Sequence, residues 1–130
     1  MRYNRRALPA ELVVLDLDLR GGEHGVWMNS RGTSTGAVDL VPRGESYTTR
    51  REPIPPFVAS VLKTIYRVGR LRRGCPDLVI WHAERERLRL VEVKGPGDEI
   101  RSDQHSFMRV ARRHGVSTRV VAWAFRDGAA

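Results

Sequence analysis

Two short segments of the sequence place charged side chains at the ends of apolar runs that read as strands. Segment 74–77 ends in Asp77 directly before the first run, and segment 91–94, which contains Glu92 and Lys94, closes the second. Because side chains alternate along a strand, Glu92 and Lys94 point to the same face. Asp77 joins them there if the loop between the strands has an even number of residues. The pattern predicts two carboxylates and one ammonium group converging at one end of a hairpin.

Hydrolysis of a phosphodiester is the chemistry that needs such a group. Carboxylate oxygens of Asp77 and Glu92, together with a backbone carbonyl such as that of Val93, suit Mg²⁺ or Mn²⁺. The ion would lower the pKa of a bound water and neutralise charge that builds on the phosphate. Lys94 could orient that water or stabilise the transition state electrostatically.

A purely structural interpretation of the same residues has to be weighed. A Pro-Asp pair is common at turns, and Glu-x-Lys is a common ion pair on exposed strands. The order of the two segments, their places on adjacent strands and the glycine-proline break that follows favour function. The choice of lysine points the same way, because 21 of the 23 basic residues are arginine and only Lys63 and Lys94 are lysine. A lysine ammonium is a compact charge whose pKa can be shifted.

The composition indicates one soluble domain over residues 1–130. Of these residues 41% are hydrophobic and 29% charged, and no apolar run approaches the roughly 20 residues that span a bilayer. Acidic residues interrupt the apolar start, so a secretory signal is not expected. Cys75 is the one cysteine, which excludes an internal disulfide and fits a reducing cytoplasm. The net charge of +8 favours a polyanionic partner, nucleic acid first.

Local patterns from residue 55 onward predict the elements that position these side chains. Prolines open a helix over 55–69, strands follow at 78–81 and 88–94, and Ser102 is a suitable N-cap for a helix that Gly115 ends. A final strand over 116–125 completes an α/β domain with a central sheet.

The first fifty residues allow more than one interpretation. Leucines at 15, 17 and 19 alternate with acidic residues as in a half-buried strand, although Pro9 could instead begin a helix over 9–19. Residues 32–36 read as a turn or loop, and 37–41 as a short strand.

The segments RGCPDLVIW at 73–81 and LVEVKGPGD at 90–98, followed by Ser102 and Gln104, resemble the VRR-Nuc family of the PD-(D/E)xK nuclease superfamily. The likeness is strongest to the nuclease domain of Fanconi-anaemia-associated nucleases and is best over residues 70–125. It implies a restriction-endonuclease-like fold, with a central mixed sheet flanked by helices in an αβββαβ core. It also implies Asp77 and Glu92 as metal ligands, Lys94 as the catalytic lysine and Gln104 beside the site.

The resemblance further implies a glutamate on the first core helix, and the 55–69 helix contains none. We therefore expect the first core helix and strand within residues 5–41, with 55–69 as an added helix. Glu11 is then the first candidate for the missing ligand and Glu52 the second.

DNA is the partner that the resemblance implies, typically in branched, flapped or junction form. Arg70, Arg72 and Arg73 precede the site and could grip its backbone. Two alternatives remain at this point: a non-catalytic DNA-binding module of the same fold, and a basic structural protein. A homodimer is equally open.

Overall fold

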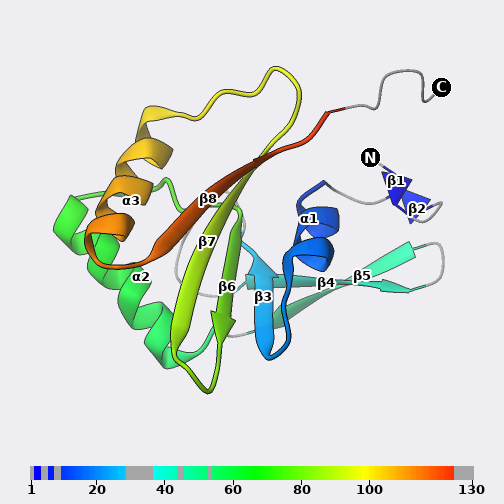
Figure 1. The fold of residues 1–130 in the computed structure, drawn as a ribbon, viewed down its shortest axis with the longest axis horizontal. Helices are drawn as coiled ribbons and strands as arrows, with labels where there is room; N and C mark the ends of the chain where they lie inside the picture. The colour runs from blue at the N-terminus through cyan, green and yellow to red at the C-terminus, as the bar shows by residue number, and fades with distance from the viewer. Residues whose placement is uncertain are drawn as a thin grey trace.

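The computed structural model describes the backbone of residues 2–3, 6–7, 10–28, 37–43, 46–52 and 54–124, and the side chains of 10–11, 14–15, 18–28 and 54–124. Its centre is a six-stranded mixed sheet in the order β5-β4-β3-β6-β7-β8 (Figure 1). Neighbouring strands are antiparallel except β7 and β8, which are parallel. The strands are β3 (Glu23–Trp27), β4 (Ala37–Arg43), β5 (Ser46–Glu52), β6 (Leu78–His82), β7 (Arg87–Lys94) and β8 (Ser117–Ala122).

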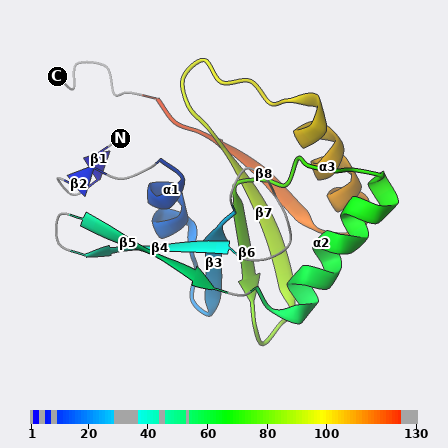
Figure 2. The same cartoon turned by 180° about the vertical axis from the view of Figure 1, so that it is seen from behind.

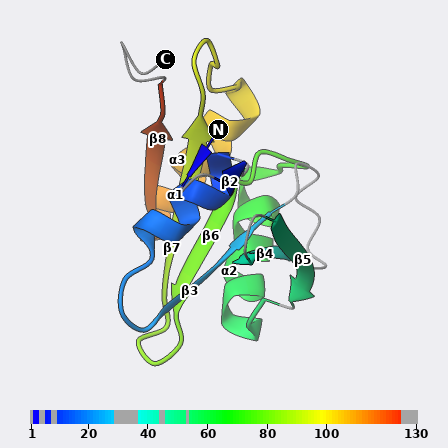
Figure 3. The same ribbon diagram turned by 90° about the vertical axis from the view of Figure 1, so that its right-hand side faces the viewer.

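Within the described residues, three helices flank the sheet: α1 (Ala10–Asp18), α2 (Pro56–Gly69) and α3 (Ser102–Arg113). A small hairpin of β1 (Arg2–Tyr3) and β2 (Arg6–Ala7) precedes them. Figure 3 shows α1 and α2 on opposite sides of β6 and β7, and Figure 2 shows the β4–β5 ribbon extending beside α1. None of the described helices combines the length and the apolarity that crossing a membrane requires.

Each face of the sheet has its own core, because side chains alternate along β6 and β7. On the face that α2 and α3 cover, Ile65 and Phe107 pack against Val79 and Leu90. On the other face, Val14 and Leu15 of α1 join a second cluster, whose sheet members are Leu78, Ile80, Val91 and Val93. The fold is therefore the α/β arrangement of a mixed sheet between helices that the sequence predicts.

Most of the expected elements are confirmed. The helix over 55–69, the strands at 37–41, 78–81 and 88–94 and the final strand lie within a few residues of α2, β4, β6, β7 and β8. A helix and a strand do lie within 5–41, as α1 and β3, and α2 follows them in the chain. The turn at 32–36 lies outside the described residues.

Of the two interpretations left open for the segment after Pro9, the helix over 9–19 is confirmed as α1 and the half-buried strand is wrong. Val14 and Leu15, adjacent in sequence, both pack on the same sheet face, which a strand would not allow. A second expectation is also wrong. The N-cap of α3 is Arg101, not Ser102. The Gln104 side chain accepts a hydrogen bond from the Arg101 backbone N–H at 2.9 Å, which fixes the helix start one residue earlier.

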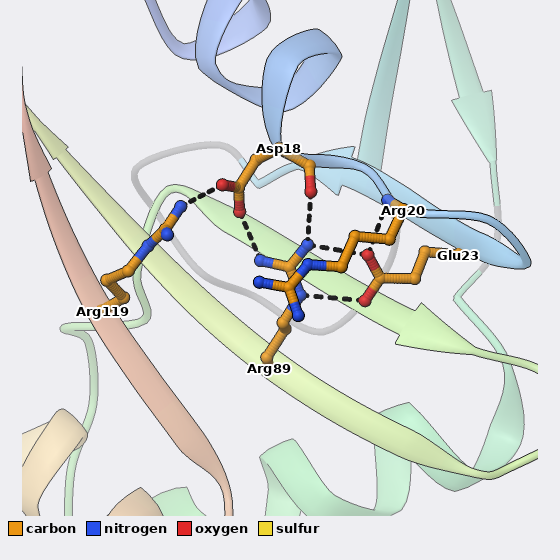
Figure 4. A network of polar contacts seen from close by, with 5 residues as sticks. All are labelled: Asp18, Arg20, Glu23, Arg89 and Arg119. Atoms are coloured by element: carbon orange, nitrogen blue, oxygen red, sulfur yellow. Dashed lines mark hydrogen bonds and ion pairs between the residues drawn. The ribbon is translucent and has the colours of Figure 1, made fainter.

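An ion network ties the end of α1 to the sheet (Figure 4). The Arg89 guanidinium on β7 donates to both Glu23 oxygens, at 2.9 and 2.8 Å, and to the Asp18 carboxylate and the Asp18 backbone carbonyl, the latter at 2.7 Å. Arg119 on β8 also pairs with Asp18. Hydrogen bonds from Arg89 are the largest cause that lowers the pKa of Glu23 to about 2. Arg89 thus joins α1, β3 and β7.

Replacing Arg89 by methionine should lower the free energy of unfolding by about 2–3 kcal/mol, because it leaves two mostly buried carboxylates without their shared cation. Arg119→Gln is the matched control. Its side chain is 50% exposed against 17% for Arg89, so its loss should cost less than about 1 kcal/mol. Urea unfolding of both variants measures the difference, and equal costs would contradict a central role for Arg89.

Candidate active site

The register of β6 and β7 brings Asp77 opposite Glu92. Leu78 pairs with Val91 and His82 with Arg87, so residues 83–86 form an even loop and the next pair along is Asp77 and Glu92. The Asp77 backbone N–H donates to Glu92 Oε2 at 3.3 Å, and the Val93 N–H donates to Asp77 Oδ2 at 3.0 Å. The two carboxylates therefore lie side by side at the end of the hairpin, as the loop parity predicts.

Gln104 and Lys94 complete the cluster. The Gln104 Nε2 group donates to Glu92 Oε1 at 2.8 Å, and its Oε1 accepts from Lys94 Nζ at 3.0 Å. Lys94 Nζ lies 3.5 Å from Glu92 Oε1. Glu92 is 1% exposed and Gln104 6%. One glutamine from the first turn of α3 thus orients both the buried carboxylate and the ammonium.

The electrostatics of the cluster favour an added cation. Burial is the main cause that raises the pKa of Glu92 to about 7, and the charge of Asp77 raises it further, while Lys94 lowers it. Two carboxylates face one ammonium, so the group carries excess negative charge when both ionise. Carboxylate oxygens keep further lone pairs beyond these hydrogen bonds. The donor set therefore fits a divalent ion.

Helix α1 brings Glu11 into the electrostatic neighbourhood of this cluster. Burial is the largest cause that raises the pKa of Glu11, and the charges of Asp77 and Asp98 add to it. Among the described side chains, however, no three His, Cys, Asp or Glu lie close enough together to hold an ion alone. Mg²⁺ commonly takes one or two carboxylates and completes its shell with water and phosphate oxygens. The Glu52 side chain lies outside the described residues.

Backbone direction adds one more oxygen to the site. Because the N–H of Val93 points at Asp77 and the N–H and C=O of one strand residue point to the same side, the Val93 carbonyl also faces Asp77.

The three arginines before the site occupy the loop between α2 and β6, and all are exposed. Arg70 is the C-cap of α2 in the left-handed region, with φ of 52°. Arg73 pairs through Nε with Asp103 on α3 at 3.3 Å, so it is anchored beside Gln104. The structure brings Arg73 to the edge of the cluster and leaves Arg70 and Arg72 on the loop.

Sequence reasoning missed Gly74. Its φ is +111°, and a Cβ there would lie 2.3 Å from the backbone oxygen of Asp103. The loop before Asp77 therefore packs backbone to backbone against the first turn of α3. A glycine three residues before the aspartate was a signal for such close contact.

Comparison with known proteins agrees with this geometry. The model of the VRR-NUC domain family matches residues 39–123. The Fanconi-associated nuclease 1 homolog of Caenorhabditis elegans is 31% identical over 68 residues, which cover 52% of this chain and 8% of that protein. Fanconi-associated nuclease 1 of Danio rerio is 39% identical over 49 residues, covering 38% and 5%. The chain thus spans less than a tenth of the length of these relatives.

A solved structure gives a partial match. The crystal structure of paFAN1 bound to 2nt 5′ flap DNA with a gap aligns with a TM-score of 0.43 and 28% identity, over 53% of this chain and 14% of that one. The family match over residues 39–123 is longer, and it contains Asp77, Glu92, Lys94 and Gln104. With most of its length matched by the family model, the chain belongs to the VRR-NUC domain family.

Proposed function

We propose that this chain is a Mg²⁺- or Mn²⁺-dependent deoxyribonuclease that hydrolyses phosphodiester bonds in branched or flapped DNA. The observation that carries the proposal is the hydrogen-bonded cluster of Asp77, Glu92, Lys94 and Gln104, in which a buried carboxylate has a pKa raised to about 7. Such perturbed groups gather at functional sites. Membership of the VRR-NUC family and similarity to nucleases support the same reaction.

In this proposal Asp77, Glu92 and the Val93 carbonyl would hold the ion, with Glu11 as a further candidate ligand. A bound ion would lower the pKa of a water molecule and offset negative charge on the phosphate. Lys94, held against Gln104 and Glu92, presents its ammonium to the attacking water or to the charge that develops on the phosphate. Gln104 fixes the spacing between that ammonium and the metal-binding carboxylate.

Branched DNA is proposed as the substrate on two grounds. The net charge of +8 attracts a polyanion, and the solved relative is bound to a 5′ flap with a gap. The test is cleavage of labelled duplex, flap, splayed-arm and four-way-junction DNA with Mg²⁺, with Mn²⁺ or with EDTA. We expect cutting only with metal. Tight binding without cutting under either metal would favour the alternative, a non-catalytic DNA-binding module of the same fold.

The metal requirement should depend on pH. A raised pKa means that Glu92 is protonated in the folded protein up to about pH 7, and protons then compete with the ion for the carboxylate. At subsaturating Mg²⁺, the cleavage rate should fall by up to about tenfold for each pH unit below 7, and saturating Mg²⁺ should shift the fall to lower pH. Mg²⁺ titrations from pH 5.5 to 8 measure this. A pH profile that excess Mg²⁺ does not move would contradict it.

A further inference from the structure

Two arginines share one carboxylate at the edge of the cluster. Arg73, on the loop before β6, places Nε 3.3 Å from Asp103 Oδ2, and Arg101, the N-cap of α3, places Nε 3.3 Å from Asp103 Oδ1. The side chains of Arg73 and Arg101 are 74% and 59% exposed, whereas that of Asp103 is 25% exposed. A mostly covered acid thus lies within ion-pair distance of two exposed guanidinium groups from different elements, although its buried Oδ1 has no hydrogen-bond partner among the described residues.

Neither of these two ion pairs uses the terminal amino groups of its guanidinium. Both ion pairs are made through Nε, and within the described part of the chain neither arginine has an ion pair through its terminal amino groups. Those amino groups form the planar fork that binds phosphate oxygens with two parallel hydrogen bonds. Exposed ion pairs of this kind add little to stability, so folding alone gives little reason for the arrangement.

The position of the pair is tied to the proposed active site. Asp103 precedes Gln104, which contacts both Glu92 and Lys94. The backbone N–H of Arg101 donates to the same Gln104 side chain. Gly74, next to Arg73, packs directly on the Asp103 backbone. The two arginines therefore pair with a residue adjacent to the cluster that would cut the DNA.

We propose that Arg73 and Arg101, held by Asp103, form a binding site for DNA backbone phosphates next to the scissile bond. The trio has a net charge of +1, and each open fork matches one phosphate. The choice of DNA as the ligand rests on the proposed function. Arg70 and Arg72 are exposed on the same loop, and the described part of the chain gives neither of them an ion pair.

Binding of a labelled flap DNA, measured across KCl concentrations in EDTA, tests the site without cleavage. Arg73→Gln and Arg101→Gln should each lower the slope of log Kd against log salt by about one, because each removes one phosphate contact. At about 100 mM KCl that corresponds to roughly tenfold weaker binding. Arg85→Gln is the matched control, since Arg85 is exposed in the turn at the opposite end of the hairpin from Lys94. Its slope should stay near that of the unmodified chain.

Arg101→Lys tests whether bidentate hydrogen bonding contributes to DNA binding beyond the positive charge. We expect it to keep the salt slope and still bind several-fold more weakly, since an ammonium cannot make the bidentate contact. Equal slopes for Arg101→Gln and Arg85→Gln, or full affinity in Arg101→Lys, would overturn the proposal. If the unmodified chain cuts DNA but the Arg→Gln variants have the same salt slope as Arg85→Gln, only the phosphate site is contradicted. If the slopes change as expected but the unmodified chain never cuts DNA, only the proposed function is contradicted.

Discussion

Replacing Lys94 by alanine should slow metal-dependent DNA cleavage by about 10²- to 10³-fold, the effect of removing one electrostatic group that acts in a transition state. The Lys94 side chain is 15% exposed, and its Nζ lies 3.0 Å from Gln104 Oε1 and 3.5 Å from Glu92 Oε1. Its loss also leaves the Glu92 carboxylate less compensated and so favours protonation of that group. Single-turnover rates at saturating Mg²⁺ separate the loss of chemistry from weakened metal binding.

The chain has its own matched control for this change. Lys63, the other lysine, is exposed on α2, and Lys63→Ala should cut at the unmodified rate. Lys94→Arg restores the charge with a planar fork in place of a compact ammonium, so we expect it to recover only a minor part of the rate. DNA binding should change little in all three variants. If Lys94→Ala cleaves DNA as fast as Lys63→Ala does, Lys94 takes no part in the reaction.

The convergence of the cluster could be predicted because it depends on local rules. Side-chain alternation in one strand places Glu92 and Lys94 on the same face. The even number of residues in one short loop places Asp77 on that face as well. Met108 and Gln104 lie on the same helix face, and both are buried. The catalytic and metal-binding roles of these residues stay predictions until the cleavage experiments are made.

The shared carboxylate of Asp103 could not be predicted in the same way. Arg73 and Arg101 come from different loops, and only the packing of the 71–76 segment on α3 brings them to one acid. A contact of that kind leaves no periodic pattern in the sequence. The network around Arg89 is a similar case, since Asp18 and Arg89 lie 71 residues apart in the sequence.

The N-terminal region shows why short elements mislead. Helix α1 has nine residues, and Leu15 and Leu17 alternate with acidic residues within it at the spacing of a strand. Isolated helices of that length are marginal, and packing decides between the two. In contrast, α2 and α3 have 14 and 12 residues with one clear apolar face, so their existence and type followed from the sequence within a residue or two.

Replacing Gly74 by alanine should both destabilise the protein and displace Gln104 from the site. The added Cβ would lie 2.3 Å from the Asp103 backbone oxygen and 2.7 Å from its carbonyl carbon, and backbone atoms cannot rotate away as a side chain can. The positive φ of +111° adds strain for any residue with a Cβ. Together, overpacking and strain should lower the free energy of unfolding by about 2–4 kcal/mol.

Gly97→Ala is the matched control, because it tests the effect of a positive φ without a steric clash of the added Cβ. Gly97 also has a positive φ, of 78°, but nothing lies within 4 Å of the Cβ it would gain. We expect it to lose about 1 kcal/mol from the left-handed backbone alone and to keep its cleavage rate. Gly74→Ala should lose cleavage even at temperatures where it is fully folded, because the first turn of α3 must shift and takes the Gln104 contacts to Glu92 and Lys94 with it. If the two variants match in stability and rate, the contact between the 71–76 loop and α3 does not set the geometry of the site.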